Sequence, residues 1–172
     1  TPEINLMIDC GVFQGLKESR NHNRKDIPFD VSTLDYVLLT HGHLDHTGFL
    51  PRLVMQGFHG KILGTAPTLD IAEIILRDSA KIHEEEAERA NDEGYSSHKP
   101  ALPFYTLEDV LKTLPKFKNT PKDTWVELSD HIKCRFIYNG HIIGSTFIEL
   151  QIFEKTFVFS GDVGRKEDHL LF

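Results

Sequence analysis

The chain has 172 residues, a formal net charge of −7 and 40% hydrophobic residues, which is the make-up of one soluble folded domain. A chain of this length buries roughly two-thirds of its unfolded surface, so small secreted disulfide scaffolds are excluded. Cys10 and Cys134 fit no C-x-x-C motif and indicate a reducing, cytoplasmic compartment. The longest apolar runs are far shorter than the roughly 20 residues that a bilayer helix requires, so no membrane contact is expected.

The first half of the sequence predicts three buried strands, over residues 4–8, 34–39 and 61–66. The first strand is followed by a polar, basic loop over residues 17–26. The second leads into a helix that we expect over residues 44–54. The third leads through Pro67 into a long helix, because apolar residues recur there at three- and four-residue spacings.

The long helix fades into glutamates over residues 84–88, which we interpret as a solvated helix surface; a divalent-metal tract is the alternative. A loop follows over residues 91–103, and a short helix begins at Thr106 and ends near Pro115. The remainder predicts four strands, over residues 125–128, 131–138, 145–153 and 156–159. Strands mixed with helices in this order predict an α/β or α+β fold with layers around a sheet.

Four polar clusters follow predicted strands: Asp9, residues 41–46, residues 140–141 and residues 161–162. Strand ends that share one edge of a sheet can converge on a ligand. The four clusters are therefore candidates for one composite site.

The sequence of residues 41–46, HGHLDH, places three imidazoles and one carboxylate directly after a buried strand. Zinc prefers such ligands, and residues two apart in an extended loop face the same side, so His41 and His43 can bind one ion. Asp45 and His46 begin a helix, where the chain turns and can present them to a second ion. A solvated polar loop is the alternative, but solubility alone does not require imidazoles at the end of a buried strand.

Three more residues extend this site. His141 would complete a three-histidine site with an open fourth position, which is typical of catalytic zinc. Asp162, between two glycines, could bridge two ions, and Asp9 could orient a ligating imidazole or a bound water. The ordinary alternatives are a loop histidine for His141 and turn aspartates for the other two. The sequence positions of the remaining histidines do not assign them to the site. These histidines are His22, His59, His83, His98, His131 and His169.

Residues 40–46 resemble the H-x-H-x-D-H signature of the metallo-β-lactamase superfamily, with Asp9 before the signature and His141 and Asp162 after it, in the family's order. The resemblance runs across the whole chain. More narrowly, three segments are similar to the β-CASP branch of RNA-processing nucleases: residues 9–15, 140–145 and 160–165.

This resemblance implies an αββα sandwich with two Zn²⁺ ions at one edge of the paired sheets. It also implies that Asp45 and Asp9 are the carboxylates closest to the chemistry. The metal-site roles that it implies are His41, His43 and His141 on the first ion, Asp45 and His46 on the second, Asp162 between both ions, and Asp9 orienting the site.

The superfamily's further histidine ligand of the second ion has no counterpart in residues 1–172. The resemblance therefore implies a partial metallo-β-lactamase domain over residues 1–172, incomplete at both ends, followed by a β-CASP cap domain. A histidine of that cap region would protonate the leaving oxygen. We expect the isolated piece to bind its second ion weakly and to cleave RNA poorly.

The expected activity is that of a zinc-dependent ribonuclease acting on single-stranded RNA, with homodimer formation left open. One alternative is hydrolysis of a small ester, thioester or lactam, because fold alone does not set the substrate. Another is a non-catalytic RNA-processing scaffold, although such partners usually lose ligands. Basic residues that could contact RNA, or simply be solvated, are Lys17, Arg20, Arg24, Lys25, Arg165 and Lys166.

Overall fold

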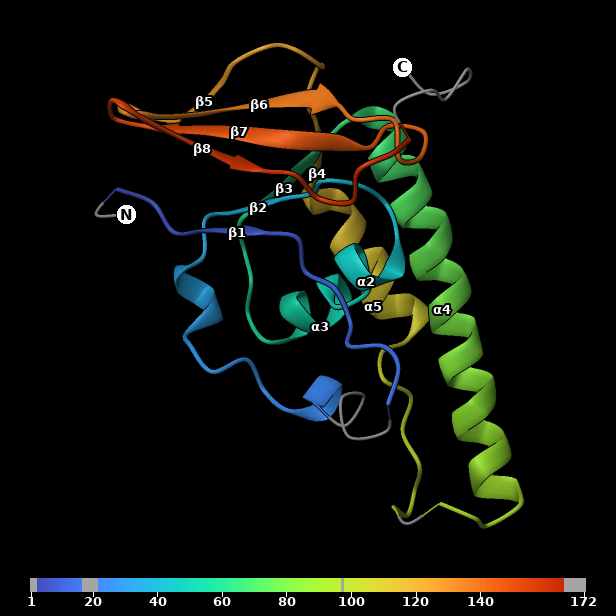
Figure 1. The fold of residues 1–172 in the computed structure, drawn as a ribbon. Helices are drawn as coiled ribbons and strands as arrows, with labels where there is room; N and C mark the ends of the chain where they lie inside the picture. The colour runs from blue at the N-terminus through green and yellow to red at the C-terminus, as the bar shows by residue number, and fades with distance from the viewer. Residues whose placement is uncertain (1–2, 17–21, 97, 166–172) are drawn as a thin grey trace.

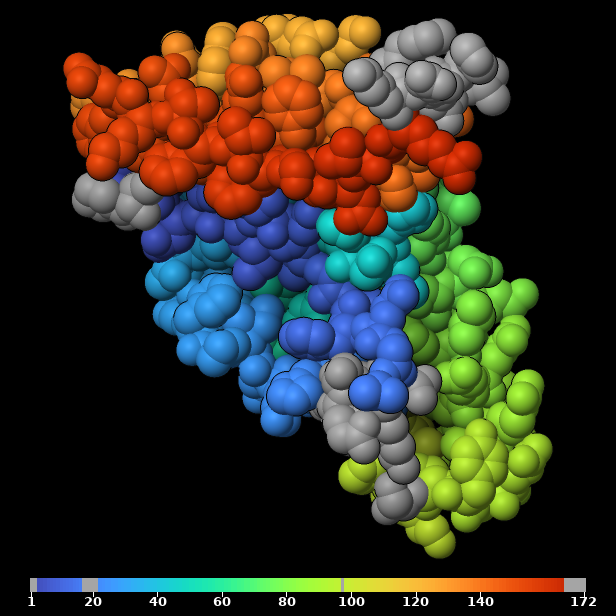
Figure 2. Space-filling model, in the orientation of Figure 1, coloured from blue at the N-terminus to red at the C-terminus, as the bar shows by residue number. Residues whose placement is uncertain are grey.

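The computed structural model describes residues 3–16, 22–96 and 98–165, which form helices and two four-stranded sheets. Helices lie against one face of the first sheet, and the second sheet covers its other face (Figure 1). The space-filling view shows the C-terminal sheet as a layer stacked directly on the N-terminal strand (Figure 2). The expected mixed α/β sandwich is confirmed. Within the described residues, three layers are present: helices, sheet and sheet.

The first sheet is parallel throughout, with the order β1 (Leu6–Ile8), β2 (Tyr36–Leu38), β3 (Lys61–Gly64) and β4 (Phe117–Asn119). The sequence did not predict β4. This segment has three residues, two of them exposed, and lacks a strand's apolar alternation. It becomes a strand because β3 offers it a free edge, with Ile62 opposite Phe117.

The helices of the structure are α2 (Leu44–Thr47), α3 (Leu50–Met55), α4 (Ala66–Asp92) and α5 (Leu107–Thr113), with short 3-10 turns at His22–Arg24, Val31–Thr33 and Leu114–Lys116. The prediction of one helix over residues 44–54 was wrong. The chain turns at Phe49, whose N–H donates to the carbonyl of Cys10 at 2.9 Å, and a new helix then begins at Leu50, with Pro51 in its first turn.

Helix α4 continues further than the sequence indicated and carries the glutamates as part of its surface. Glu85, Glu86 and Glu88 are exposed, which fits the solvated interpretation. None of them belongs to the group of possible metal ligands found among the described residues. Part of the predicted basic loop forms the His22–Arg24 turn, and residues 17–21 lie outside the described residues.

The second sheet is an antiparallel meander of β5 (Val126–Ser129), β6 (Ile132–Tyr138), β7 (Thr146–Ile152) and β8 (Lys155–Phe159). Strands β6 and β7 pair over their whole length, from Ile132 opposite Ile152 to Tyr138 opposite Thr146. All four strands were predicted to within one residue at both ends. Regular alternation of buried and half-buried residues along β6 and β7 explains this success.

Strand β2 shows how the layers share the core. Val37 and Leu39 pack into the cluster between the first sheet and the helices, whereas Leu38 packs into the cluster between the two sheets. Successive side chains along extended backbone point to opposite faces, so the short strand β2 and the residue after it supply both cores.

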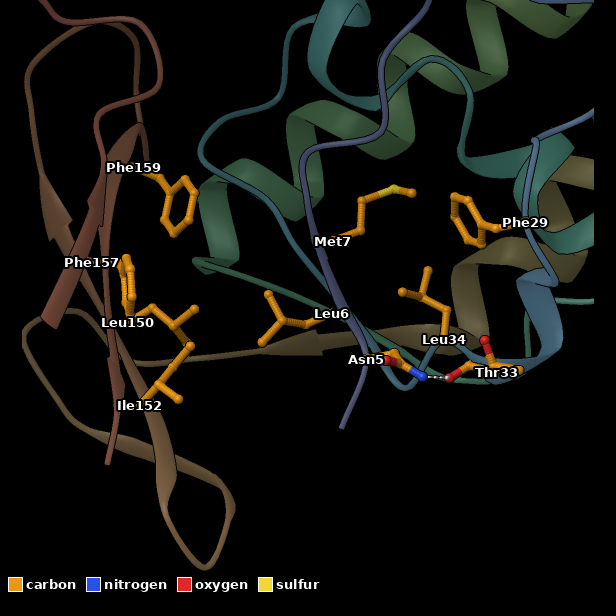
Figure 3. A pocket seen from close by; sticks show the side chains of 10 residues that line it. All are labelled: Asn5, Leu6, Met7, Phe29, Thr33, Leu34, Leu150, Ile152, Phe157 and Phe159. Carbon is orange, nitrogen blue, oxygen red and sulfur yellow. Dashed lines mark hydrogen bonds between the residues drawn. The ribbon is translucent and has the colours of Figure 1, made fainter. Parts of the chain in front are cut away.

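Among the described residues, no further strand or helix covers one side of the sandwich. The edge strands β1 and β8 border a cavity of about 650 Å³, which we call the open-edge trough. Phe157 and Phe159 are opposite Leu150 and Ile148 on β7 and remain half exposed. Figure 3 shows the trough with its lining residues, which are Asn5, Leu6, Met7, Phe29, Thr33, Leu34, Leu150, Ile152, Phe157 and Phe159.

Candidate metal centre

The candidate site is formed where four segments distant in sequence meet. The segments follow β1, β2 and β8 and connect β6 to β7. They bring together His41, His43, His141 and Asp162, each of which offers one ligand atom within 4.8 Å of the others. The convergence of strand ends expected from the sequence is present in the fold.

Three imidazole nitrogens form the centre of this group. His43 Nδ1 lies 3.0 Å from His41 Nε2 and 3.2 Å from His141 Nε2. Nitrogens bound to one tetrahedral Zn²⁺ at about 2.0–2.1 Å lie about 3.3 Å apart, which is close to these spacings. The donor set and its spacing therefore fit a zinc ion.

Asp162 lies between this trio and His46. Its Oδ2 is 3.6 Å from His141 Nε2, and its Oδ1 is 3.5 Å from His46 Nε2. Asp45 Oδ2 is 4.0 Å from the same His46 nitrogen. The two oxygens of Asp162 thus face two adjacent groups of possible ligands, which is the arrangement that a bridging carboxylate needs.

Asp9 holds His46 from the side opposite these groups. Its Oδ2 lies 2.7 Å from His46 Nδ1, so His46 Nε2 is directed toward Asp45 and Asp162. Asp9 itself has a left-handed backbone (φ 55°), and its N–H donates to the Leu38 carbonyl at 2.9 Å. Aspartate tolerates this conformation better than most residues, and it turns the chain sharply at the end of β1.

Two histidines of the site have displaced pKa values, in opposite directions. Burial, followed by the charges of His46 and His43, lowers the pKa of His41 to about 4. The hydrogen bond to Asp9 raises the pKa of His46 above its usual value. At neutral pH His41 is therefore an uncharged imidazole, the form that binds a metal.

Close backbone approach explains two glycines of the site. A Cβ on Gly11 would lie 1.5 Å from the carbonyl oxygen of Asp45, so only glycine lets the segment after Asp9 lie against the HGHLDH loop. A Cβ on Gly161 would lie 2.7 Å from Thr40 Cβ, and Gly161 also has a positive φ of 53°.

Asn139 and Ser145 fix the loop that carries His141, although neither was predicted from the sequence as a residue of the site. Ser145 Oγ accepts the N–H of His141 at 3.0 Å and donates to Asn139 Oδ1 at 2.7 Å. Asn139 Nδ2 then donates to the Asp162 carbonyl at 2.9 Å. The amide and hydroxyl thereby tie the His141 loop to the Asp162 loop. The available signal was their position on either side of the G-H-I-I-G segment.

The remaining histidines stay outside the centre in the described part of the chain. His131 bonds Glu3 at 2.7 Å and stacks on Phe153, while His83 packs against Tyr105 and burial lowers its pKa. His169 lies outside the described residues. Of the six basic candidates, the described ones, Arg24, Lys25 and Arg165, are exposed, and Lys17, Arg20 and Lys166 lie outside the described residues.

The model of the Metallo-beta-lactamase superfamily matches residues 1–172. The chain belongs to this superfamily. It is 36% identical over 166 residues to Ribonuclease TTHA0252 of Thermus thermophilus, covering 96% of this chain and 34% of that protein. It is 33% identical over 167 residues to the transcription termination factor FttA of Cenarchaeum symbiosum, covering 95% of this chain and 24% of that protein.

Integrator complex subunit 11 of Danio rerio is 27% identical over 174 residues, which cover 97% of this chain and 27% of that protein. The β-CASP RNA-processing resemblance stated from the sequence is confirmed by these relatives. This chain spans about a quarter to a third of the length of the curated relatives that it matches.

Solved structures of low identity support the same fold. A metallo-β-lactamase mutant of Cronobacter sakazakii matches with a TM-score of 0.56 at 17% identity, covering 99% of this chain and 57% of that chain. Metallo-β-lactamase SMB-1 matches with a TM-score of 0.54 at 19% identity, covering 96% and 58%. In the described residues, no helix has the length and apolar character needed to cross a bilayer.

Proposed function

We propose that the protein is a zinc-dependent ribonuclease that cleaves phosphodiester bonds of single-stranded RNA. The observation that carries the proposal is the convergence of three imidazole nitrogens on one side of Asp162, with His46 on its other side. The name of one curated relative, Ribonuclease TTHA0252, supports RNA over a small ester, thioester or lactam.

In this proposal the ligand groups divide into two. His41, His43 and His141 would hold one Zn²⁺, and Asp45 with His46 would hold the other. Asp162 would be shared between the two groups, in line with its distances of 3.6 Å to His141 and 3.5 Å to His46. These proposed ligands, together with Asp9 as the residue that orients the site, are the same residues that the sequence predicted.

When bound, two such ions lower the pKa of water toward about 7 and offset the negative charge of a phosphodiester. The chain's own residues supply orientation. Asp9 accepts from His46 Nδ1 and fixes the direction of the other ring nitrogen. Asp45, with about half of its side chain exposed, is the carboxylate open to an incoming substrate. Because Asp162 is equally exposed, the substrate can approach both carboxylates from solvent.

The proposal extends to the whole protein. We infer a β-CASP cap domain after residue 172 that completes the second ion's ligands and donates a proton to the leaving oxygen. Two buried, free thiols, Cys10 and Cys134, support a reducing cytoplasmic compartment. A homodimer is a further assembly compatible with the proposal, and the mass of the full-length protein by light scattering tests it.

The test uses the full-length protein loaded with zinc, and Asp162→Asn as the variant. We expect the unchanged protein to cleave a labelled single-stranded RNA, and Asp162→Asn to lose at least about 100-fold in rate, because even ligand-supporting residues are worth 10–100-fold. Asp92→Asn, the same substitution at the exposed end of α4, is the matched control and should keep full activity.

A chromogenic lactam and a thioester serve as competing substrates in the same assay. Turnover of either compound without RNA cleavage would replace the ribonuclease by a small-molecule hydrolase. Full RNA cleavage by Asp162→Asn, with zinc content unchanged, would remove Asp162 from the proposed centre.

A further inference from the structure

Thr40 is a buried residue directly before the HGHLDH loop, and it was not among the candidate site residues. Its hydroxyl lies 2.7 Å from Asp9 Oδ2 and 3.0 Å from His41 Nδ1. Its N–H donates to Asp9 Oδ1 at 2.7 Å. Asp9 in turn lies 2.7 Å from His46 Nδ1. A continuous line of hydrogen bonds therefore runs from His41 through Thr40 and Asp9 to His46.

The donors and acceptors on this line fix its direction. An ionised carboxylate only accepts, so Asp9 takes the one proton that the Thr40 hydroxyl can give. The Thr40 oxygen then accepts from its other neighbour, which makes His41 Nδ1 the protonated ring nitrogen. His41 Nε2 is left with a free lone pair, and this is the nitrogen that lies 3.0 Å from His43 Nδ1 in the centre.

The surroundings of Thr40 hold it in this position. Its side chain is 1% exposed, and its carbonyl accepts the N–H of Thr146 at 2.8 Å. Gly161, one residue before Asp162, approaches so closely that a Cβ there would meet the Thr40 methyl and hydroxyl within 3.1 Å. The hydroxyl therefore lies in a closely packed environment, next to the segment that carries Asp162.

We propose that Thr40 is a positioning residue: it fixes the tautomer of His41 and, through Asp9, couples His41 on one ion to His46 on the other. The inference rests on the proposed zinc centre and names a residue that acts on both of its halves. Removing the hydroxyl frees His41 to adopt the other tautomer, whose Nε2 carries a proton and cannot bind zinc. Groups that support ligands in this way are worth about 10–100-fold in metal affinity.

The first experiment measures zinc affinity of the full-length protein by competition with a chromogenic chelator. Thr40→Val keeps the shape and loses the hydroxyl, so zinc should bind about 10–100-fold more weakly. Thr40→Ser keeps the hydroxyl and should restore most of the affinity. Thr113→Val removes a hydroxyl from an equally buried threonine in α5 and should leave zinc affinity unchanged.

A second measurement reads the tautomer in the zinc-free protein. The ¹⁵N shifts of the His41 ring, assigned by comparison with His41→Gln, should show a protonated Nδ1. In Asp9→Asn an amide N–H can replace the carboxylate oxygen that faces Thr40, so the hydroxyl reverses, donates to His41 Nδ1 and moves the ring proton to Nε2. This measurement does not depend on Thr40→Val folding normally.

The outcomes separate the two proposals. Zinc affinity of Thr40→Val equal to that of the unchanged protein, or an Nε2-protonated His41 in the unchanged protein, would overturn the role of Thr40 alone. A full-length unchanged protein that binds no zinc would overturn the proposed ribonuclease instead.

Discussion

The metal-centre end and the open-edge trough of the same sandwich differ in their side chains, which are polar at the metal centre and mostly apolar along the trough. At the metal centre, buried and half-buried polar groups are linked by short hydrogen bonds, such as Asp9 to Thr40 and to His46. Along the trough, β1 and β8 present apolar side chains that are only half covered, Phe157 among them. The polar groups of the metal centre are therefore paired with one another, whereas the apolar edge is left without a partner strand among the described residues.

The largest expected effect is on the free energy of unfolding, when a phenylalanine buried between the sheets and one at the open edge are each replaced by alanine. Phe136 is fully buried between the sheets, so Phe136→Ala should lower the free energy of unfolding by about 3–5 kcal/mol. Phe157 is 45% exposed, and Phe157→Ala should cost only about 1–2 kcal/mol, because less area is lost and the edge can relax. Denaturant unfolding measures both.

Equal costs for the two alanine variants would contradict an open edge. They would mean that Phe157 is as fully enclosed in solution as Phe136, and the comparison between the two regions would have to be redrawn.

A smaller effect concerns pH in the zinc-free protein. The folded-state pKa of His41 is lowered to about 4, so between about pH 6.5 and 4 the unfolded chain binds a proton that the folded protein does not. Stability should therefore fall by up to about 3 kcal/mol as the pH drops through this window. The folded-state pKa of His46 is raised, so its contribution to stability is present below about pH 6.5 and is lost as the pH rises through that raised pKa.

Stability of the zinc-free protein should thus be highest near pH 6.5, which thermal unfolding across a pH series measures. His41→Gln should reduce the loss of stability on the acid side, whereas Phe157→Ala should shift the whole curve without changing its shape, because none of the described residues that line the trough is titratable. If the loss of stability below about pH 6.5 were the same in His41→Gln as in the unchanged protein, groups other than His41 would be responsible for it.

The smallest expected effect is on dye binding at the trough. Anilinonaphthalene sulfonate binds exposed apolar surface, so Phe157→Ser should lower its fluorescence with the protein. Ile74→Ser removes a still more exposed apolar side chain from α4, outside the trough, and serves as the matched control. A larger loss of fluorescence with Ile74→Ser would place the main apolar binding surface on α4.

The sequence by itself determined the fold class and most of the secondary structure, and it predicted the candidate ligands. Residue types and spacing predicted His41, His43 and their neighbours as candidate metal ligands, because imidazole and carboxylate groups are ligands that zinc prefers. Alternating burial identified β6 and β7, because side-chain direction in a strand depends only on local geometry. The superfamily followed from the order of the same motifs.

Only the tertiary structure decided how these parts meet. The β4 strand exists because β3 had an unpaired edge, and the helix break at Phe49 follows from its bond to Cys10, 39 positions earlier in the chain. The roles of Asn139, Ser145 and Thr40 depend on contacts between segments up to about a hundred residues apart, and their side chains look ordinary in sequence. Hydrogen bonds over such separations leave no local pattern, because they form only when the folded core brings distant loops within about 3 Å.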